Sequence, residues 1–320
     1  MRALLIVNPH ATSTTRGRRD VIVRALASAV DLEVVQTRYR GEATSLAAAA
    51  ASDKFGLVMA LGGDGTVNEA VNGLLQAANG DGPEKRPALA ALPGGNANVF
   101  IRSLGLPADP VDAAGRLIHD LAADVERVIG LGLATSGEPG SLQRGRYFTF
   151  NAGLGLDAEV VRAVEGRRAH GKYVTPVMYA ATALRQYYRV TDRRHPAITI
   201  GDPPGLSDRE AYACFVSNSA PWTYLGERPV NTNPDASFDN GLDLMALLSL
   251  GSIATGRTLR QMLARRADPP RGRSVLTAHD LGSVTLQAAR PMAVQLDGEY
   301  MGEAEQVRFC AVPRALRVIA

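Results

Sequence analysis

The clearest chemical signal in the sequence is a glycine-rich segment with one carboxylate, LGGDGTVNEAVNGL at residues 61–74. An apolar stretch runs into Gly-Gly-Asp-Gly-Thr, and a helical pattern follows at once. Glycines let backbone N–H groups approach a phosphate chain closely, and a helix N-terminus favours an anion. Asp64 would repel that anion, so its presence indicates support of Mg²⁺ or of a proton transfer. A plain strand–turn–helix junction would tolerate Gly-Asp-Gly alone, but the longer run favours a phosphate site.

A second glycine-rich segment, LPGGNANVFIRSLGLP at residues 92–107, follows the next apolar strand. Gly94 and Gly95 end that strand, and Asn96 and Asn98 supply short amide side chains before another helical pattern. Pro-Gly-Gly by itself is a common turn. Because the two segments follow neighbouring strands, we expect them to form the two sides of a nucleotide cradle.

The first 127 residues alternate between strand-like and helix-like patterns. Near-continuous apolar strands separated by helices are typical of a parallel sheet covered on both faces. Ligands of such sheets bind beyond the carboxyl ends of the strands, which is where both glycine-rich segments fall. We expect strands at 3–7, 32–36, 55–61 and 88–92, and helices at 18–29, 44–52 and 67–77.

From about residue 128 the pattern changes to short β-prone segments separated by Gly, Pro, Asp and Asn. This spacing predicts a mostly antiparallel, sandwich-like β-rich domain, with helices near 158–165, 177–188 and 252–263. The predicted fold class is therefore α/β, with a nucleotide-binding domain over 1–127 and a β-rich domain over 128–320. The expected strands of the second domain cover 127–133, 147–152, 197–200, 211–217, 242–250, 283–288 and 293–296.

Composition excludes several classes of protein. With 46% apolar and 21% charged residues, the chain has a globular composition, and 5% aromatic residues argue against a stacking platform for nucleic acid. No apolar run reaches about eighteen residues, and the N-terminal run is too short for a signal peptide. We therefore expect a cytoplasmic protein with only peripheral membrane contact. Arginine clusters such as Arg265, Arg266, Arg271 and Arg273 fit either solvated surfaces or anionic lipid headgroups.

Taken together, the motifs resemble the diacylglycerol kinase catalytic-domain family, whose bacterial lipid kinase branch includes sphingosine and ceramide kinases. Nearly the whole chain takes part in the resemblance. Besides the two glycine-rich segments, it rests on Asn8-Pro9, NAGLGLDAEVV at 151–161, DNGLDLMAL at 239–247 and LDGEY at 296–300. Gly-Gly-Asp-Gly-Thr alone is shared with NAD kinases and, more weakly, with phosphofructokinases.

The resemblance implies phosphoryl transfer from ATP, with Mg²⁺, to a lipid hydroxyl in a cleft between the two domains. Diacylglycerol at the inner face of the membrane is the expected acceptor. Asp64 would act through Mg²⁺, and Asn68 and Glu69 would brace the glycine-rich loop. The nucleotide contacts that the resemblance implies are Asn8, Thr37, Gly62, Gly63, Gly65, Thr66, Gly94, Gly95 and Asn98, together with Asn68 and Glu69.

Two acidic sites in the second domain also follow from the resemblance. Asp297 would be the general base that accepts the proton of the lipid hydroxyl, with Glu299 beside it for metal binding or orientation. Asp-Gly is also a favoured hairpin turn, so a purely structural interpretation stays open. Asp239 and Asp243 match a metal-stabilised loop of the family, although Asn240 interrupts the usual pattern and a simple turn is the alternative.

The sequence departs from the family pattern in both phosphate segments. His10 and the residues after it replace a frequent Ser-Gly-Lys, so the cation near the phosphates would come from elsewhere, with Arg16 and Arg18 as candidates. In the second segment, Asn96 and Val99 stand where threonine and aspartate are usual.

Three other functions stay open at this point. The acceptor could be a sphingoid base or another lipid alcohol, or the chain could be an NAD kinase or a nucleotide-binding regulator without catalysis. An apolar groove would favour a lipid acceptor, and residues 173–187 supply apolar side chains at helical spacing that could line one. The sequence is also compatible with a homodimer.

Overall fold

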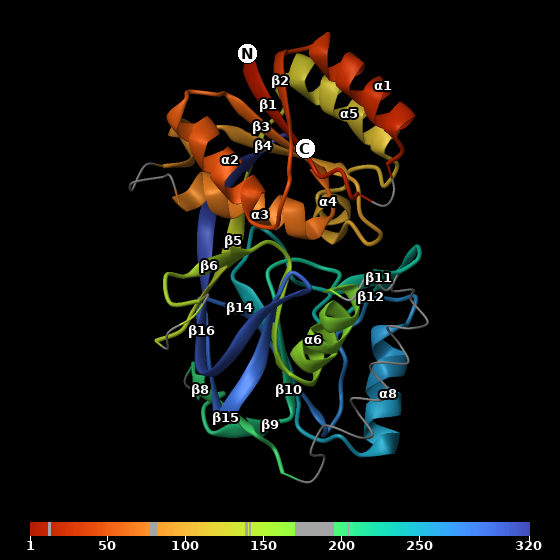
Figure 1. Cartoon of the computed structure of the whole chain (residues 1–320). Coiled ribbons are helices and arrows are strands. Elements are labelled where there is room, and N and C mark those ends of the chain that lie inside the picture. Colours follow the sequence, from red (N-terminus) through yellow and green to blue (C-terminus); the bar gives the residue numbers. More distant parts are fainter. Residues whose placement is uncertain (12–13, 77–81, 138–139, 141, 170–194, 204) are drawn as a thin grey trace. The chain divides into compact units, whose positions relative to one another are not determined.

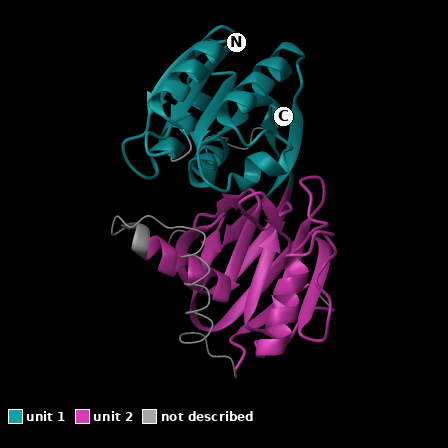
Figure 2. Ribbon diagram, turned by 90° about the vertical axis from the view of Figure 1, so that its right-hand side faces the viewer, with its two compact units in different colours: residues 1–131, 313–320 teal, residues 132–312 magenta. Residues whose placement is uncertain are grey.

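The computed structural model describes residues 1–11, 14–76, 82–137, 140, 142–169, 195–203 and 205–320. The chain forms two compact units (Figure 2). Unit 1 comprises residues 1–131 and 313–320, and unit 2 comprises residues 132–312. The last eight residues therefore belong to unit 1, whereas a single domain boundary at residue 127 would place them in the second domain.

Unit 1 is built on a parallel sheet in the order β4-β3-β1-β2. Its last partner comes from the C-terminal end of the chain, where Val318 pairs with Leu89 in parallel. The strands are β1 Arg2–Val7, β2 Asp31–Gln36, β3 Leu57–Gly62 and β4 Ala88–Pro93. This arrangement confirms the parallel sheet that the apolar runs predict.

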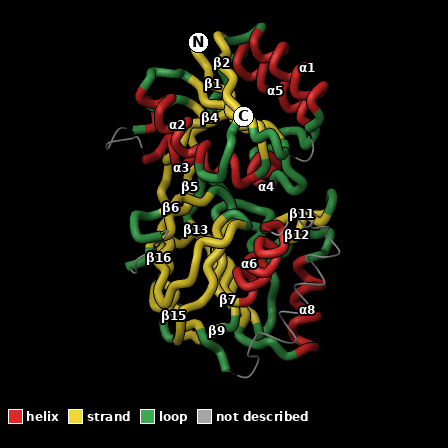
Figure 3. The backbone as a smooth tube through the Cα atoms, viewed as in Figure 1, coloured by secondary structure: helices red, strands yellow, loops and turns green. Residues whose placement is uncertain are grey.

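Helices cover both faces of this sheet. Helices α1 and α5 pack together on one face, and α2 and α3 pack together on the other (Figures 1 and 3). Every residue of β3 and β4 is buried as a result, whereas the edge strand β2 is largely exposed. The helices are α1 Arg16–Ala27, α2 Glu42–Ser52, α3 Asp64–Gln76, the short 3₁₀ helix η1 Pro83–Lys85, α4 Val99–Ser103 and α5 Pro110–Ala122.

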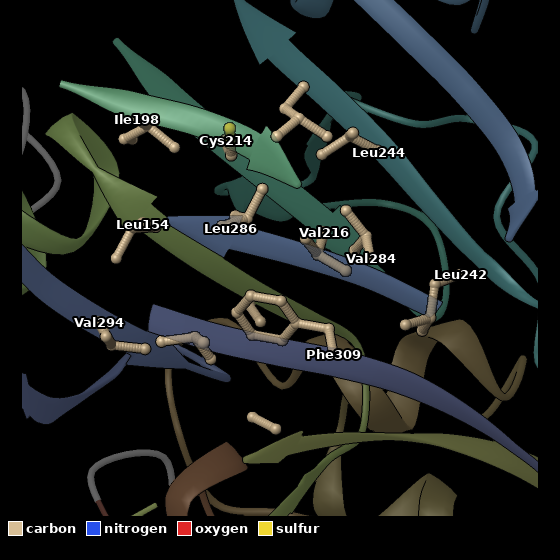
Figure 4. Packing of buried hydrophobic residues seen from close by; sticks show 14 of the residues in the cluster. Leu154, Ile198, Cys214, Val216, Leu242, Leu244, Val284, Leu286, Val294 and Phe309 are labelled. Atoms are coloured by element: carbon tan, nitrogen blue, oxygen red, sulfur yellow. The ribbon is translucent and has the colours of Figure 1, made fainter. Parts of the chain in front are cut away.

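Unit 2 contains an antiparallel sheet in the order β14-β13-β10-β7-β15-β16, and β8 and β9 extend it from β15. Phe309, Leu286 and Val216 lie in a large apolar cluster between its strands (Figure 4). Helix α6 Leu156–Ala169 and helix α8 Ser252–Met262 accompany the sheet. The strands are β5 Arg127–Thr135, which enters from unit 1, β6 Arg146–Phe148, β7 Asn151–Gly155, β8 Ile198–Asp202, β9 Arg209–Ala211, β10 Ala213–Ser217, β11 Thr223–Leu225, β12 Arg228–Val230, β13 Leu242–Leu247, β14 Val275–Leu281, β15 Ser283–Leu296 and β16 Glu299–Val318, which ends in unit 1.

Most element boundaries agree with the sequence prediction, and the differences are informative. Helix α3 begins at Asp64 rather than near residue 67, so the glycine-rich run is not a loop. The strands expected at 283–288 and 293–296 are one long strand, β15. The helix expected at 177–188 lies outside the described residues. Within the described ranges, no helix is long and apolar enough to span a membrane.

The close contact between α2 and α3 provides a test of the fold. A Cβ atom at Gly73 would lie 2.2 Å from the carbonyl oxygen of Thr44. We expect Gly73→Ala to destabilise the protein by about 1–3 kcal/mol through overpacking, measured by urea unfolding. Gly115→Ala is the control, because that helical glycine has no neighbour within 4 Å of the added atom. It should stabilise by up to about 1 kcal/mol, and equal effects of the two substitutions would contradict the predicted α2–α3 contact.

Candidate functional site

The glycine-rich run of residues 61–74 forms a direct junction between strand β3 and helix α3. The strand ends at Gly62, and the helix begins at Asp64, with the N–H of Val67 donating to the carbonyl oxygen of Gly63 at 3.2 Å. The first N–H groups of any α-helix have no acceptor within the helix. Since Gly65 and Thr66 lie in this first turn, the junction presents backbone donors and a helix N-terminus beyond the carboxyl end of a buried strand.

The two glycine-rich segments touch each other through their backbones. Gly94 donates its N–H to the carbonyl oxygen of Gly62 at 2.8 Å. A Cβ at Gly94 would lie 2.8 Å from the Cα of Gly62, and a Cβ at Gly95 would lie 2.8 Å from the Cα of Gly63. None of these four glycines has a positive φ, so close approach explains them, not an unusual backbone conformation. The two segments are therefore joined where β3 and β4 end, and the nucleotide cradle stays a prediction.

Asn98 shapes the second segment from within. The backbone of Asn98 has a left-handed conformation, with φ 46°, and the residue directly precedes helix α4. Its side-chain Oδ1 accepts from the N–H of Gly95 at 2.8 Å, and its Nδ2 donates to the carbonyl oxygen of Gly95 at 2.8 Å. Both ends of the amide are thus used to hold Gly95. The side chain therefore supports the conformation of the second glycine-rich segment, and its contact with a nucleotide stays a prediction.

Asp64 lies where the two segments meet. One of its carboxylate oxygens accepts from the N–H of Phe100, in the first turn of helix α4, at 3.2 Å. The residue is partly exposed, so its carboxylate remains accessible from solvent. Mg²⁺ in nucleotide sites is commonly held by one or two carboxylates together with phosphate oxygens. Asp64 therefore fits the role of a single protein carboxylate for Mg²⁺–nucleotide.

Strand ends β1 and β2 supply the remaining contacts of the unit 1 site. The side-chain amide of Asn8 donates to the hydroxyl of Thr66 at 3.1 Å, which ties the end of β1 to helix α3. Thr37, just after β2, donates its N–H to Val7 at 2.9 Å. The structure thus brings Asn8 and Thr37 to the edge of the sheet where the glycine junction lies.

Asn68 and Glu69 make contacts along and beside helix α3. The carboxylate of Glu69 accepts from the N–H of Gly41 at 2.8 Å, and therefore holds the connection 37–41. Asn68 accepts from the side chain of Asn72 along helix α3 at 3.1 Å. Their bracing of the glycine-rich loop stays a prediction.

Arginines other than the two candidates also lie near the unit 1 site. Arg18 forms an ion pair with Asp109 at 3.2 Å, and Arg16 is an exposed residue at the start of α1. The connection 37–41, which Glu69 holds beside α3, carries Arg38 and Arg40. Arg38 in turn forms an ion pair with Glu42 at 2.9 Å, so ion pairing does not favour Arg38 over Arg18 as the cation near the phosphates.

In unit 2, Asp297 and Gly298 form the tight turn between β15 and β16. Both residues have positive φ, 50° and 76°, and Leu296 pairs with Glu299 across the turn. Two consecutive left-handed residues define the hairpin turn that Asp-Gly favours. The structural interpretation of Asp-Gly is therefore correct as far as the backbone is concerned.

The carboxylate of Asp297 is buried, with 4% exposure, and accepts four hydrogen bonds. Oδ2 accepts from the N–H and the hydroxyl of Thr149 at 2.7 and 2.8 Å. Oδ1 accepts from the N–H groups of Phe150 and Asn151 at 2.9 and 3.1 Å. A carboxylate offers about four acceptor positions, so these donors use them. This geometry favours a role in positioning the turn over a role as general base.

Glu299 differs from Asp297 in its surroundings. Its side chain is 20% exposed, and it forms an ion pair with Arg146 at 4.0 Å. A carboxylate that reaches solvent next to an ordered turn meets the geometric requirement for a proton acceptor better than a fully bonded one.

A buried polar network joins the segment 151–161 to the same turn. Gln295 donates to Asp157 and to Asn151, both at 2.8 Å, and its side-chain oxygen accepts from the N–H of Gly298 at 2.9 Å. A Cβ at Gly153 would lie 2.4 Å from the carboxylate of Asp157, which explains that glycine. Burial raises the pKa of Asp157 from 3.8 to about 7, although the hydrogen bond from Gln295 opposes the shift.

Asp239 and Asp243, the predicted ligands of a second metal ion, differ in their surroundings. The carboxylate of Asp243 is bound to His279 at 2.8 Å and accepts from the N–H of Asp280 at 3.1 Å. Burial raises the pKa of Asp243, although the hydrogen bond with His279 opposes the shift. Asp239 is exposed. Among the described residues, no group of three or more His, Cys, Asp or Glu side chains could hold a metal ion.

A parallel sheet that runs into a glycine-lined helix N-terminus, followed by an antiparallel β-rich unit, defines an α/β protein, and such strand ends commonly bind anions. Residues 2–128 match the diacylglycerol kinase catalytic domain. Over these residues the chain is therefore similar to kinases of the diacylglycerol kinase catalytic domain family, as the motifs predict.

Similar proteins extend the match beyond unit 1. Over 313 residues the chain is 27% identical to a diacylglycerol kinase of Bacillus subtilis, covering 94% of this chain and 90% of that protein. A probable lipid kinase of Chromohalobacter salexigens, described as YegS-like, is 43% identical over 95 residues, which are 30% of this chain and 29% of that protein. The crystal structure of a diacylglycerol kinase from Bacillus anthracis aligns with TM-score 0.71 at 21% identity, covering 99% of this chain and 96% of that one. This last likeness confirms the fold, a parallel α/β part followed by a largely antiparallel part.

The contact between the glycine pairs can be tested by one methyl group. Gly94→Ala should lower both stability and nucleotide affinity, because the added Cβ collides with the backbone of Gly62. We expect about 1–3 kcal/mol of destabilisation from overpacking, and at least a tenfold weaker binding of a fluorescent ATP analogue. Gly17→Ala in α1, where nothing lies within 4 Å, serves as the control. Unchanged nucleotide affinity in Gly94→Ala would contradict the site.

The buried carboxyl group of Asp157 predicts a specific pH dependence. Because its folded pKa is raised from 3.8 to about 7, the folded state binds more protons in that range, and the contribution of Asp157 to stability falls as pH rises. Asp157→Asn removes this effect. The free energy of unfolding of the variant, relative to that of the natural protein, should therefore rise between pH 3.8 and about 7 and level off at higher pH. The largest gain is about 4 kcal/mol. Urea unfolding across pH checks it, with the exposed Asp20→Asn as control, and a pH-independent difference would contradict the shift.

Proposed function

We propose that the protein is an ATP-dependent lipid kinase that phosphorylates the free hydroxyl of diacylglycerol to give phosphatidic acid. The observation that carries the proposal is the glycine junction, where backbone donors, a helix N-terminus and Asp64 lie together at the strand ends. The match of residues 2–128 to the diacylglycerol kinase catalytic domain supports a kinase, and the names of the similar proteins support a lipid acceptor. We further propose that it acts at the cytoplasmic surface of a membrane, where such a substrate resides.

Unit 1 would bind and orient the phosphates of ATP. The N–H groups at the start of α3 would donate to phosphate oxygens, and Thr66 would be held in place by Asn8. Mg²⁺, when bound with ATP, would neutralise charge on the transferred phosphate, and Asp64 is its candidate protein ligand. Phosphoryl transfer needs positioning and charge neutralisation more than covalent catalysis, so a rigid backbone site suits this reaction.

Unit 2 would supply the carboxylate that accepts the proton of the lipid hydroxyl. The hydrogen bonds of Asp297 suit a residue that fixes the turn, and Glu299, one residue beyond that turn, suits the proton acceptor. The proton of the hydroxyl would pass to Glu299 as the oxygen attacks the terminal phosphorus of ATP, with ADP as the leaving group. Atoms and charge balance without any further reactant.

The acceptor is tested by phosphate transfer from labelled ATP, with Mg²⁺, to mixed micelles of diacylglycerol, ceramide, sphingosine or undecaprenol, and to NAD in a parallel reaction. Label in phosphatidic acid that disappears in Asp64→Ala supports the proposal. Label in another lipid would keep the reaction and replace the substrate. Label in NAD alone would overturn the lipid acceptor, and a protein that binds ATP but transfers nothing would be a regulator.

The division of roles between the two carboxylates gives a sharper prediction. Asp297→Asn should lower the unfolding free energy by about 1–3 kcal/mol, because its new amide donors face the N–H groups of residues 149–151. Glu299→Gln should leave stability nearly unchanged and lower kcat by about 10²–10⁴-fold, the usual contribution of a general base. Urea unfolding and steady-state kinetics measure the two effects. Loss of turnover at full stability in Asp297→Asn, with an active Glu299→Gln, would show that Asp297 is the base.

A further inference from the structure

Positive charge is concentrated in one short region of unit 2, which begins with helix α8. Residues 251–275 contain six arginines and one aspartate, a net charge of +5, whereas the whole chain has a net charge of +3. The remainder of the chain is therefore slightly acidic. A local charge of this size on a nearly neutral protein indicates a surface that meets an anionic partner.

Three of these arginines line a pocket of about 840 Å³ between the start of α8 and the segment 271–275. Arg257 comes from the helix, and Arg271 and Arg273 come from the segment. In the part of the chain that the structure describes, no carboxylate forms an ion pair with any of the three. Asp268, the region's only acidic residue, pairs with Arg266 at 3.2 Å.

The arginine segment is held in a defined conformation against α8. Gln261 of the helix accepts from the N–H of Arg271 at 2.7 Å and donates to its carbonyl oxygen at 3.1 Å. Both main-chain polar groups of Arg271 are thus bound to one side chain. The arginines are therefore attached to an ordered backbone. Less backbone conformational entropy is lost on binding an anion as a result.

Helix α8 also exposes apolar side chains among its charges. Ile253 is 91% exposed and Leu259 is 50% exposed, whereas Thr258 and Met262 are buried against the unit. Ile253, Arg257 and Arg260 follow at spacings of four and three, so they lie on one outward face. A basic helix face with exposed aliphatic side chains is typical of helices that lie in a membrane interface.

We propose that the outward face of α8 and the segment 271–275 dock unit 2 on anionic phospholipid bilayers. The pocket between Arg257, Arg271 and Arg273 would take one lipid phosphate, and Ile253 would insert among the acyl chains. Nucleic acid is the weaker alternative, because an exposed isoleucine has no partner on a phosphate backbone. The role that we assign to docking, delivery of a membrane-borne acceptor, rests on the proposed kinase function, but the docking itself does not.

Vesicle binding tests this surface directly. The full-length protein is sedimented with vesicles of equal parts phosphatidylglycerol and phosphatidylcholine, and with phosphatidylcholine alone. Each basic residue near an anionic surface adds about fivefold in affinity, so the triple variant Arg257→Gln, Arg271→Gln and Arg273→Gln should bind about a hundredfold more weakly. Binding should also fall with salt, and Ile253→Ser should weaken it while leaving the charge unchanged.

A matched control removes the same charge elsewhere. Arg24, Arg209 and Arg290 are exposed arginines outside the region, and their triple change to glutamine should leave most of the vesicle affinity. Equal losses in the two triple variants would overturn the assignment of this surface. So would unchanged binding in the α8 variant, or tighter binding of duplex DNA than of anionic vesicles.

Activity separates this inference from the proposed function. On a short-chain diacylglycerol dissolved below its micelle concentration, the α8 triple variant should keep the kcat/KM of the natural protein, because none of its residues belongs to the candidate catalytic groups. On long-chain diacylglycerol in anionic vesicles, the same variant should lose activity in proportion to binding. Arginine-dependent vesicle binding without any kinase activity would support docking and refute the proposed function alone.

Discussion

The organisation of unit 1 depends on one constraint, the contact between two pairs of glycines at the ends of β3 and β4. Gly94 and Gly95 lie so close to Gly62 and Gly63 that a Cβ atom on Gly94 or Gly95 would collide with the opposite backbone. This approach lets Gly94 bond to Gly62 and brings Asp64 within 3.2 Å of the N–H of Phe100. Without it, a carboxylate, a helix N-terminus and a second glycine turn would not meet at one edge of the sheet.

In unit 2, buried carboxylates rather than close-packed glycines hold the backbone of the candidate site in place. Asp297 holds the N–H groups of residues 149–151, and Gln295 links Asp157 to the N–H of Gly298. The sharp turn that carries Glu299 is thus held from both of its sides. Desolvation of Asp157 destabilises the folded protein at neutral pH. A carboxyl group retained at such a cost is consistent with selection for an ordered turn rather than for stability.

The sequence identifies the parts of the site better than their tasks. Apolar runs and glycine segments were sufficient to predict the parallel sheet, because both are local patterns. The contact between Gly63 and Gly95 is not local, so the sequence does not predict that these glycines also pack against each other. Helix α3 starts earlier than predicted, since glycine disfavours helices and Gly65 suggested a loop. Asp297 is ambiguous for another reason, because Asp-Gly serves equally as a turn and as a motif. The return of residues 313–320 to unit 1 has no local signature at all.

The arginines of helix α8 contribute charge to the protein surface and are not needed for folding. Its inner face needs only residues such as Thr258 and Met262 to pack against the unit, and the outer arginines add repulsion among themselves. That repulsion raises the free energy of the unbound protein and is relieved at an anionic surface. It therefore increases the free energy gained on binding. Because the rest of the chain is slightly acidic, an anionic bilayer would attract this region and repel much of the remainder. Such an asymmetry orients unit 2 with α8 toward the surface, which a uniformly basic protein could not achieve.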